Sequence, residues 1–117
     1  MPAFGTSHIP PAKTSETIEL IQDIIIPELN FTENVELADV CSFLETKTAD
    51  LDPKEKGIKF KMSPEIQDLI RRGRDYTINA KFRNAHVVTI LNTLCYIRSL
   101  DYSVEDDTVT FKLKRSN

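Results

Sequence analysis

The stretch that decides the fold is YTINAKFRNAHVVTILNTLCYIRSLDYSV, residues 76–104. Residues 76–82 alternate between apolar and polar side chains, which is typical of a half-buried strand. Asn84 is the predicted N-cap of the helix that follows. The buried face of this helix is predicted from apolar residues at helical spacing: Val87, Ile90, Leu91, Leu94 and Ile97. A further strand is predicted at residues 102–104.

A similar order of elements occurs about fifty residues earlier, a spacing that indicates an internal repeat. Residues 22–31 contain a β-branched run that predicts a strand, and Pro27 predicts that this strand is an edge or is bulged. Asn34 predicts a second N-cap, and the helix after it is predicted to end near Thr48 with one apolar face: Leu37, Val40, Cys41 and Leu44. A half of this kind cannot bury both faces of its helix, so we expect the two halves to pack together.

The remaining segments complete an α+β fold with the order β-α-β-(α)-β-α-β-β. Residues 58–62 alternate as a strand, and Ser63-Pro64 begins a short helix that Gly73 ends. Residues 109–113 predict the last strand, after a hairpin turn at residues 105–107. We expect residues 1–21 to be a flexible leader with a short helix possible at 14–21, residues 22–114 to be the domain, and residues 115–117 to be a tail.

The periodic positions also predict the core and the state of the cysteines. Ten residues are expected to be mostly buried: Leu37, Val40, Leu44, Phe60, Ile78, Phe82, Ile90, Leu91, Leu94 and Val104. In the internal repeat Cys41 aligns near Leu91 and not with Cys95, so we expect the two thiols not to be bonded to each other.

Length and composition indicate one ordinary globular domain. The chain has 117 residues, 40% of them hydrophobic and 28% charged, with a net charge of -3 that argues against a dedicated nucleic-acid binder. No apolar run approaches the roughly 20 residues that span a bilayer, so we expect no membrane insertion. The N-terminus has no export-signal pattern. Two interpretations stay open: a cytosolic protein, or a piece of a larger protein whose signal lies outside this chain.

The residues that commonly carry catalysis or bind metals do not form a recognisable constellation. Cys41 lies on an apolar helix face, where thiols are inert, and His86 is interpreted as a solvated or capping residue. The acidic groups at residues 50–52 and 105–107 lack the spacing of a calcium loop, and the three glycines are isolated. We therefore expect no enzymatic activity, no metal, no cofactor and no small-molecule substrate.

One surface feature is a candidate interaction patch, formed by Arg71, Arg72, Arg74, Tyr76, Lys81 and Arg83. Its functional interpretation is an acidic partner, bound by charge complementarity. A nucleic-acid partner would require stacking aromatics and a net basic domain. The simpler interpretation, which we favour, is a solvated helix end whose arginines complement the C-terminal helix dipole.

Residues 24–113 resemble the secretin and TonB short N-terminal (STN) domain, a periplasmic module of secretins, TonB-dependent transducers and related envelope proteins. The resemblance is carried by IIIPELNF-TEN-VELADVCSFL, GIKFKM and the segment from residue 76 onward, with the extended segment ending at Phe82, then Asn84 and its helix as the most telling portion. It implies two main helices sandwiched between a two-stranded and a three-stranded sheet, with protein–protein contact and neither cofactor nor reaction. Two features depart from the family pattern: the long connection with an added helix at residues 48–73, and Ser99 in place of a frequent glycine.

Two functional hypotheses follow. The first is a non-enzymatic protein–protein interaction module of a bacterial cell-envelope protein of secretion or signalling, located in the periplasm by resemblance. It would dock through strand edges, for which the Pro27 strand and the strand at 109–113 are the candidates. The partner would be a protein, with homo-oligomerisation through a larger parent protein also open. The alternative is a cytosolic nucleic-acid-binding α+β domain that uses the patch from Arg71 to Arg83.

Overall fold

The computed structural model describes residues 12–114, so most of the predicted leader and the predicted tail lie outside the described residues. Helices and strands alternate along most of the chain. Their bounds are α1 Ala12–Asp23, β1 Ile25–Glu36, α2 Leu37–Leu51, β2 Lys59–Met62, α3 Pro64–Arg71, β3 Thr77–His86, α4 Val87–Arg98, β4 Leu100–Glu105 and β5 Thr108–Leu113.

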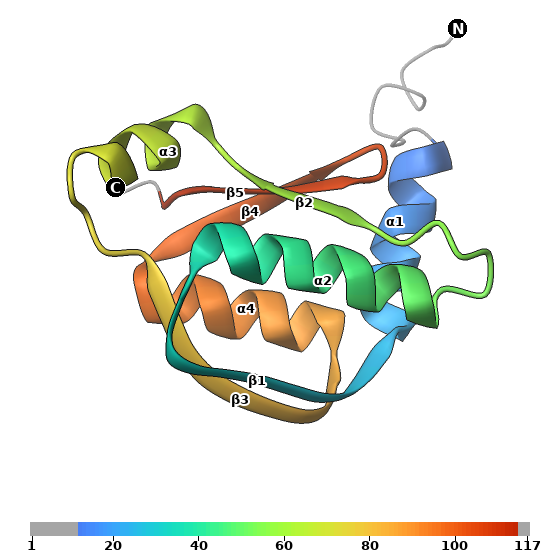
Figure 1. Ribbon diagram of the computed structural model, residues 1–117. Helices are drawn as coiled ribbons and strands as arrows, with labels where there is room; N and C mark the ends of the chain where they lie inside the picture. Colours follow the sequence, from blue (N-terminus) through green and yellow to red (C-terminus); the bar gives the residue numbers. More distant parts are fainter. Residues whose placement is uncertain (1–11, 115–117) are drawn as a thin grey trace, which may run out of the picture.

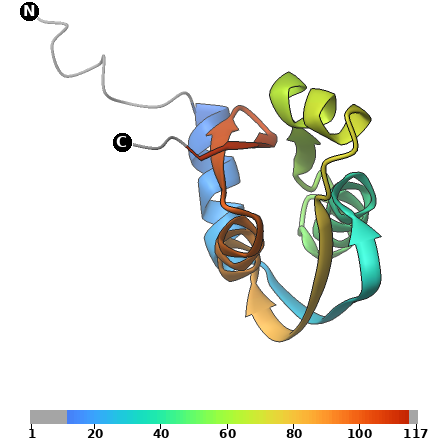
Figure 2. The ribbon, with the colours of Figure 1, turned by 90° about the vertical axis from the view of Figure 1, so that its left-hand side faces the viewer.

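The two main helices, α2 and α4, lie between two small sheets (Figure 1). One sheet is the antiparallel pair β1–β3, and the other has the order β2-β5-β4, with β2 parallel and β4 antiparallel to β5. An end-on view shows both helices in the layer between the sheets (Figure 2). The predicted α+β class and the predicted sandwich of helices between a two- and a three-stranded sheet are confirmed.

The core fills the space between the helices and the inner faces of both sheets. Eight of the ten residues predicted to be buried have relative exposures of 4% or less, whereas Phe82 on β3 and Val104 on β4 are half-buried. The assignment of Ile97 to the buried face of α4 is wrong, since this side chain is 39% exposed. In the last turn of α4 it is Arg98 that turns toward β3, where its Nε donates to the Thr77 carbonyl at 2.7 Å.

The internal repeat is present with an offset of fifty residues, since α2 begins at Leu37 and α4 at Val87. The predicted caps are wrong, because the residues at the two N-cap positions are Glu36 and His86. Asn34 and Asn84 instead lie inside strands, with φ of 58° and 49°. Asparagine tolerates this left-handed conformation better than most residues. The two asparagines therefore bend the strands, and the strands run on for two more residues before each helix begins.

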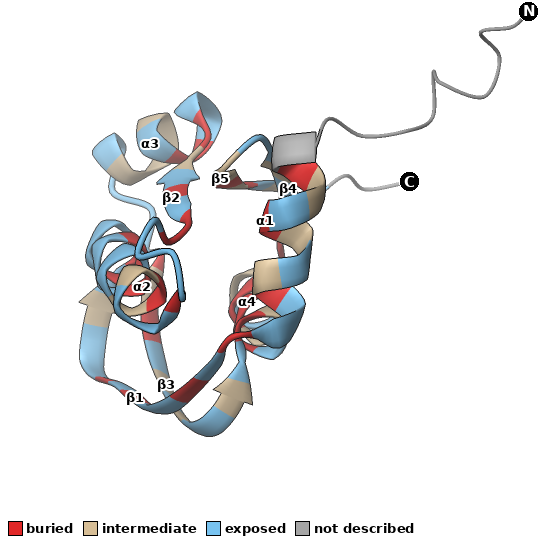
Figure 3. Cartoon of the chain, turned by 90° about the vertical axis from the view of Figure 1, so that its right-hand side faces the viewer, coloured by how far each residue is buried: buried red, intermediate tan, exposed pale blue. Residues whose placement is uncertain are grey.

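Helix α1 covers the short helix that was expected as possible at residues 14–21, and it packs on the domain, which corrects the assignment of residues 12–21 to a flexible leader. Its inward face carries Thr14, Thr17 and Ile21, all buried, and the helix packs beside α4 and β4 (Figure 3). Thr14 Oγ1 accepts a hydrogen bond from the Asp106 amide at 2.9 Å, and Thr17 Oγ1 donates to the Asp106 carbonyl at 2.6 Å. Within the described residues, α1 is therefore part of the folded unit and is anchored to the turn between β4 and β5.

The connection from α2 to β2 is organised around one carboxylate. Asp52 is 5% exposed and accepts hydrogen bonds from the amides of Lys54 at 3.0 Å, Lys56 at 3.1 Å and Gly57 at 2.9 Å. Burial disfavours the charged form, but these three amides and the Lys54 charge outweigh it and hold the pKa of Asp52 below its ordinary value of 3.8. Asp52 is therefore a structural residue of this loop.

We expect Asp52→Asn to lower the free energy of unfolding at neutral pH by about 1–3 kcal/mol, because an amide replaces an ionised acceptor of three hydrogen bonds, one of them buried and two partly buried. A lowered folded-state pKa stabilises the fold above the unfolded-state pKa and loses this effect as pH falls through the folded-state pKa. The difference between the two proteins in urea unfolding should therefore be full at neutral pH and shrink below about pH 4. A difference that does not change between pH 7 and pH 3 would contradict this role.

Candidate functional site

The edges of the two sheets determine where a partner strand can add. The strands β1 and β3 form a sheet of their own, so each has one unpaired edge, and in the other sheet β2 and β4 are outermost. The prediction that the strand at 109–113 is an edge is wrong, because β5 pairs with β2 on one side and β4 on the other. The prediction that the Pro27 strand is an edge is confirmed.

The edge of β2 is covered by side chains of the neighbouring helices. Thr48 Oγ1 accepts from the Ile58 amide at 3.0 Å just before the strand, and Glu45 Oε2 accepts from the Phe60 amide at 3.0 Å. Gln67 Nε2 of α3 donates to the Met62 carbonyl at 2.9 Å. Backbone groups that already have partners offer little to an incoming strand.

The edge of β4 faces α1. The helix runs beside β4 and α4 (Figure 3), and it is fixed to the end of the hairpin by the Thr14 and Thr17 bonds to Asp106. A strand that added to β4 would have to displace this helix and expose its buried face.

The edge of β1 is interrupted at two points. Pro27 has no N–H to donate, and the pairing register shifts between Phe31 and Val35, where Glu33 and Asn34 have φ of 69° and 58°. In addition, the Phe43 ring of α2 packs edge-on against Phe31, with 5.9 Å between the ring centroids. Bulges and prolines of this kind are features that discourage strand addition.

The edge of β3 is continuous and open over residues 78–83, whereas at Thr77 the amide donates to Asp75 Oδ1 at 2.9 Å and the carbonyl accepts from Arg98 Nε at 2.7 Å. Among residues 77–83 there is no proline and no residue with positive φ. On the inner face, Ala80 and Phe82 of β3 remain partly exposed, whereas their partners on β1, Phe31 and Leu29, are 1% and 2% exposed. At these two pairs the apolar layer under the sheet is therefore complete on the β1 side and incomplete on the β3 side, whereas at the third pair Ile78 of β3 is buried and Val35 of β1 is partly exposed.

The predicted patch does not form one surface. Arg71, Arg72 and Arg74 lie at and just beyond the end of α3, beside the three-stranded sheet, whereas Lys81 and Arg83 lie on the two-stranded sheet across the helix layer (Figure 1). Arg71 and Arg72 both pair with Asp68, at 3.5 and 3.0 Å, in exposed ion pairs that contribute little to stability. The structure brings together only Lys81 and Arg83, which are exposed on the outer face of β3.

The two other members of the patch line a hollow between α3 and the start of α2. Arg74 and Tyr76 border this space of about 450 Å³ together with the carboxylates of Glu36 and Asp75. Tyr76 is 7% exposed, so its ring is not available as a stacking platform for bases. With two carboxylates beside one arginine, the hollow has no surplus of positive charge for an anion.

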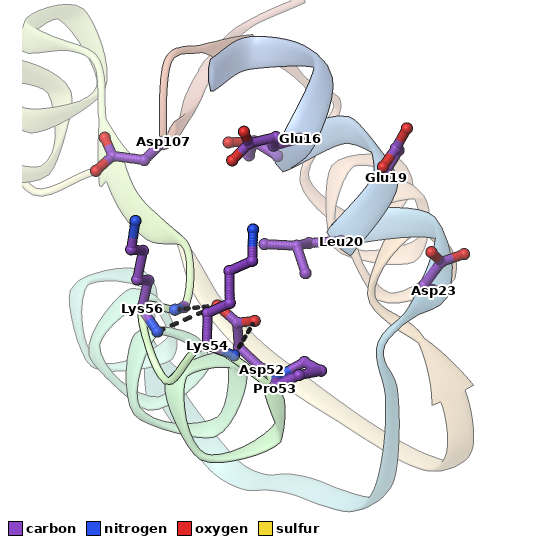
Figure 4. A pocket seen from close by; sticks show the side chains of 11 residues that line it. Glu16, Glu19, Leu20, Asp23, Asp52, Pro53, Lys54, Lys56 and Asp107 are labelled. Carbon is purple, nitrogen blue, oxygen red and sulfur yellow. Dashed lines mark hydrogen bonds between the residues drawn. The ribbon is translucent and has the colours of Figure 1, made fainter. Parts of the chain in front are cut away.

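A second hollow, of about 250 Å³, lies between α1 and the loop that Asp52 organises (Figure 4). Glu16 and Asp107 border it on one side, and Lys54 and Lys56 rise from the loop on the other. The Asp52 carboxylate is occupied by the loop amides, drawn as dashed lines. Opposite charges that face each other in this way attract α1 to the loop, and no nucleophile with an adjacent base is present among the lining residues.

The thiols of Cys41 and Cys95 are buried, and the His86 ring contacts a backbone carbonyl. Burial raises the pKa of Cys41 to about 12 and that of Cys95 to about 11, with the charges of Glu45 and Asp101 adding to the respective effects. Both thiols are free, which confirms the prediction that they are not bonded to each other. His86 Nδ1 is 2.8 Å from the Gln22 carbonyl and connects the end of β3 to the end of α1.

The described residues hold no cluster of potential metal ligands and no membrane-spanning helix. Residues 12–114 contain no group of three or more His, Cys, Asp or Glu side chains that could hold a metal ion. In the same part of the chain no helix has the length and apolar character needed to cross a membrane. No protein-family model, no curated protein and no solved structure matches this chain.

The candidate site is therefore the open edge of β3. The sequence had indicated Lys81 and Arg83, which lie on the outer face of β3. It had not indicated that Ala80 and Phe82 provide partly exposed apolar surface on the inner face of the same strand. The alternation of these four residues was visible in the sequence. Their position at an unpaired edge was not, because it depends on which strands pair.

Proposed function

We propose that this chain is a non-enzymatic protein–protein interaction module that binds an extended segment of a partner protein along the edge of β3. The single observation that carries the proposal is the open β3 edge, with Ala80 and Phe82 partly exposed beneath it. The edges of the other outer strands in the described chain are covered or interrupted.

Strand addition suits this edge energetically. Backbone N–H and C=O groups of the partner would pair with those of β3 and supply affinity. Partner side chains on the inner face would cover Ala80 and Phe82, and burial of apolar surface contributes about 25 cal/mol per Å². Binding would therefore bury the apolar surface of Ala80 and Phe82 that is partly exposed in the free chain.

The cellular setting that we propose is the bacterial envelope, in a secretin- or TonB-transducer-like protein of secretion or signalling. The proposal draws on the sequence resemblance of residues 24–113 to STN domains. It is also consistent with the arrangement of two helices between a two- and a three-stranded sheet, which that resemblance implied.

The rival function is nucleic-acid binding by the patch from Arg71 to Arg83 in a cytosolic domain. The division of this patch between two faces and the burial of Tyr76 favour the docking function. In fluorescence anisotropy with short labelled DNA and RNA we expect no binding tighter than about 10⁻⁴ M at physiological salt. Micromolar binding that is lost in Arg72→Glu/Arg74→Glu would overturn the docking function in favour of the rival.

Site-specific photo-crosslinking in the cells that produce the protein tests docking itself. A benzophenone amino acid replaces Asn79, which is exposed on β3, and in a matched control it replaces Ser103, which is exposed on β4. We expect one discrete adduct with a partner protein from position 79 and none from position 103. Equal adducts from both positions, or an adduct from position 103 alone, would contradict docking at β3.

A further inference from the structure

We infer that the β3 edge selects a partner segment in which acidic residues alternate with apolar ones, an inference that rests on the proposed docking function. The acidic residues would lie on the outer face beside Lys81 and Arg83. The apolar residues would lie on the inner face against Ala80 and Phe82.

The outer face of β3 has a surplus of positive charge. Lys81 and Arg83 are exposed, lie two residues apart on one face, and form no ion pair with a described residue. Across the sheet Lys81 is opposite Asn30, and Arg83 is opposite Glu28. Glu28 is the only carboxylate opposite these two cations in the β1–β3 register, and its Oε2 already accepts a hydrogen bond from Asn30 Nδ2 at 2.9 Å.

A strand added to β3 would place its own outer-face side chains beside Lys81 and Arg83. Neighbouring residues on adjacent strands have Cβ atoms about 4.5–5.5 Å apart, so opposite charges at these positions stabilise the pairing and like charges weaken it. Because side chains alternate between faces along a strand, acidic residues two positions apart meet both cations.

The inner face of β3 determines which residues the partner segment carries between its acidic residues. Ala80 and Phe82 point toward the helix layer and remain partly exposed at the edge. A polar side chain placed over them would lose water contacts without finding a partner, which costs free energy. Apolar side chains at these positions would instead extend the core beyond β3.

A second copy of the chain is a poor occupant of this edge. Antiparallel pairing of β3 with β3 of another copy, centred on Phe82 so that the two partly exposed apolar segments meet, would bring Lys81 of one copy opposite Arg83 of the other, and like charges on neighbouring strands are destabilising. The occupant that fits is therefore an acidic, extended segment of a different protein.

The test uses two labelled seven-residue peptides, one that alternates Val with Glu and one that alternates Val with Lys. Their binding is measured by fluorescence anisotropy, and the binding site is located by amide chemical shifts. The proteins are the unaltered chain, Lys81→Glu/Arg83→Glu, and a control with the same charge change, Lys61→Glu/Lys112→Glu, whose residues are exposed on the three-stranded sheet.

We expect the acidic peptide to bind the unaltered chain about tenfold more tightly than the basic one, with shifts centred on β3. The preference should reverse in Lys81→Glu/Arg83→Glu and persist in the control. Equal affinity for both peptides, or a preference that survives Lys81→Glu/Arg83→Glu, would overturn the inference about charge. Dimerisation of the chain through β3 in analytical ultracentrifugation would overturn it in favour of a second copy.

The outcomes also separate this inference from the proposed function. If neither peptide binds but position 79 gives its specific adduct in cells, the acidic-segment inference is wrong and docking at β3 stands. If neither peptide binds and position 79 gives no specific adduct, both are wrong.

Discussion

Replacing Leu91 by alanine is expected to lower the free energy of unfolding by roughly 2–5 kcal/mol, the range for large-to-small changes in packed cores. Leu91 is 0% exposed on the face of α4 that packs into the core. Removing its side-chain atoms loses the free energy gained by their burial. It also leaves a cavity that the helices and sheets can fill only partly. Urea or guanidinium unfolding of the purified chain measures the change.

The matched control on the same helix is Tyr96→Ala. Tyr96 is 87% exposed, so its truncation should change the free energy of unfolding by no more than about 0.5 kcal/mol. A loss below about half a kcal/mol for Leu91→Ala, or equal losses for the two variants, would show that the assigned buried face of α4 is wrong.

The second large effect is expected for Gly57→Ala, in the loop that Asp52 organises. Gly57 has φ of 70°, and a Cβ there would lie 2.7 Å from both the backbone N and the Cα of Ala49 in α2. The left-handed conformation costs an L-residue about 1–2 kcal/mol, and overpacking adds typically 1–3 kcal/mol. The loss should therefore total roughly 2–5 kcal/mol in the same unfolding measurement.

Gly73→Ala separates the two contributions. Gly73 has φ of 95°, but no heavy atom lies within 4 Å of a Cβ placed there. Its substitution should cost only the conformational part, about 1–2 kcal/mol. If Gly57→Ala costs no more than Gly73→Ala, the close approach of this loop to α2 is not present in solution.

Much of the fold was predictable because its signals are local. The alternation at residues 76–82 and the helical spacing of Val87, Leu91 and Leu94 depend only on nearby residues, and both elements are present, although the strand continues to His86 and the helix begins after it. Ser63 was likewise a correct cap, since its Oγ accepts from the Ile66 amide at 3.4 Å.

The start of each main helix was not predictable, because the same residue type is common in two different local structures. Asparagine is a common N-cap and also one of the few residues that adopts positive φ readily, and Asn34 and Asn84 take the second role. The sequence allowed a short helix at residues 14–21, but it did not show that this helix packs on the domain through Thr14 and Thr17, which lie three residues apart on the buried face of α1.

The candidate site depends on pairing over long distances in the sequence. The patch from Arg71 to Arg83 is continuous in sequence, but Gly73 and the start of β3 carry the chain from one sheet to the other. The central position of β5 results from its parallel pairing with β2, which lies about fifty residues earlier. No local pattern contains that information.

Amide hydrogen exchange tests the central claim, docking at β3, most directly. It is measured on the free chain and on its complex with the partner captured through position 79. In the free chain, alternate β3 amides over residues 78–83 should exchange faster than those of the central strand β5, since one edge of β3 is unpaired there. In the complex we expect these β3 amides to become protected while β4 is unchanged. Protection at β4 or α3 with β3 unchanged would contradict the account.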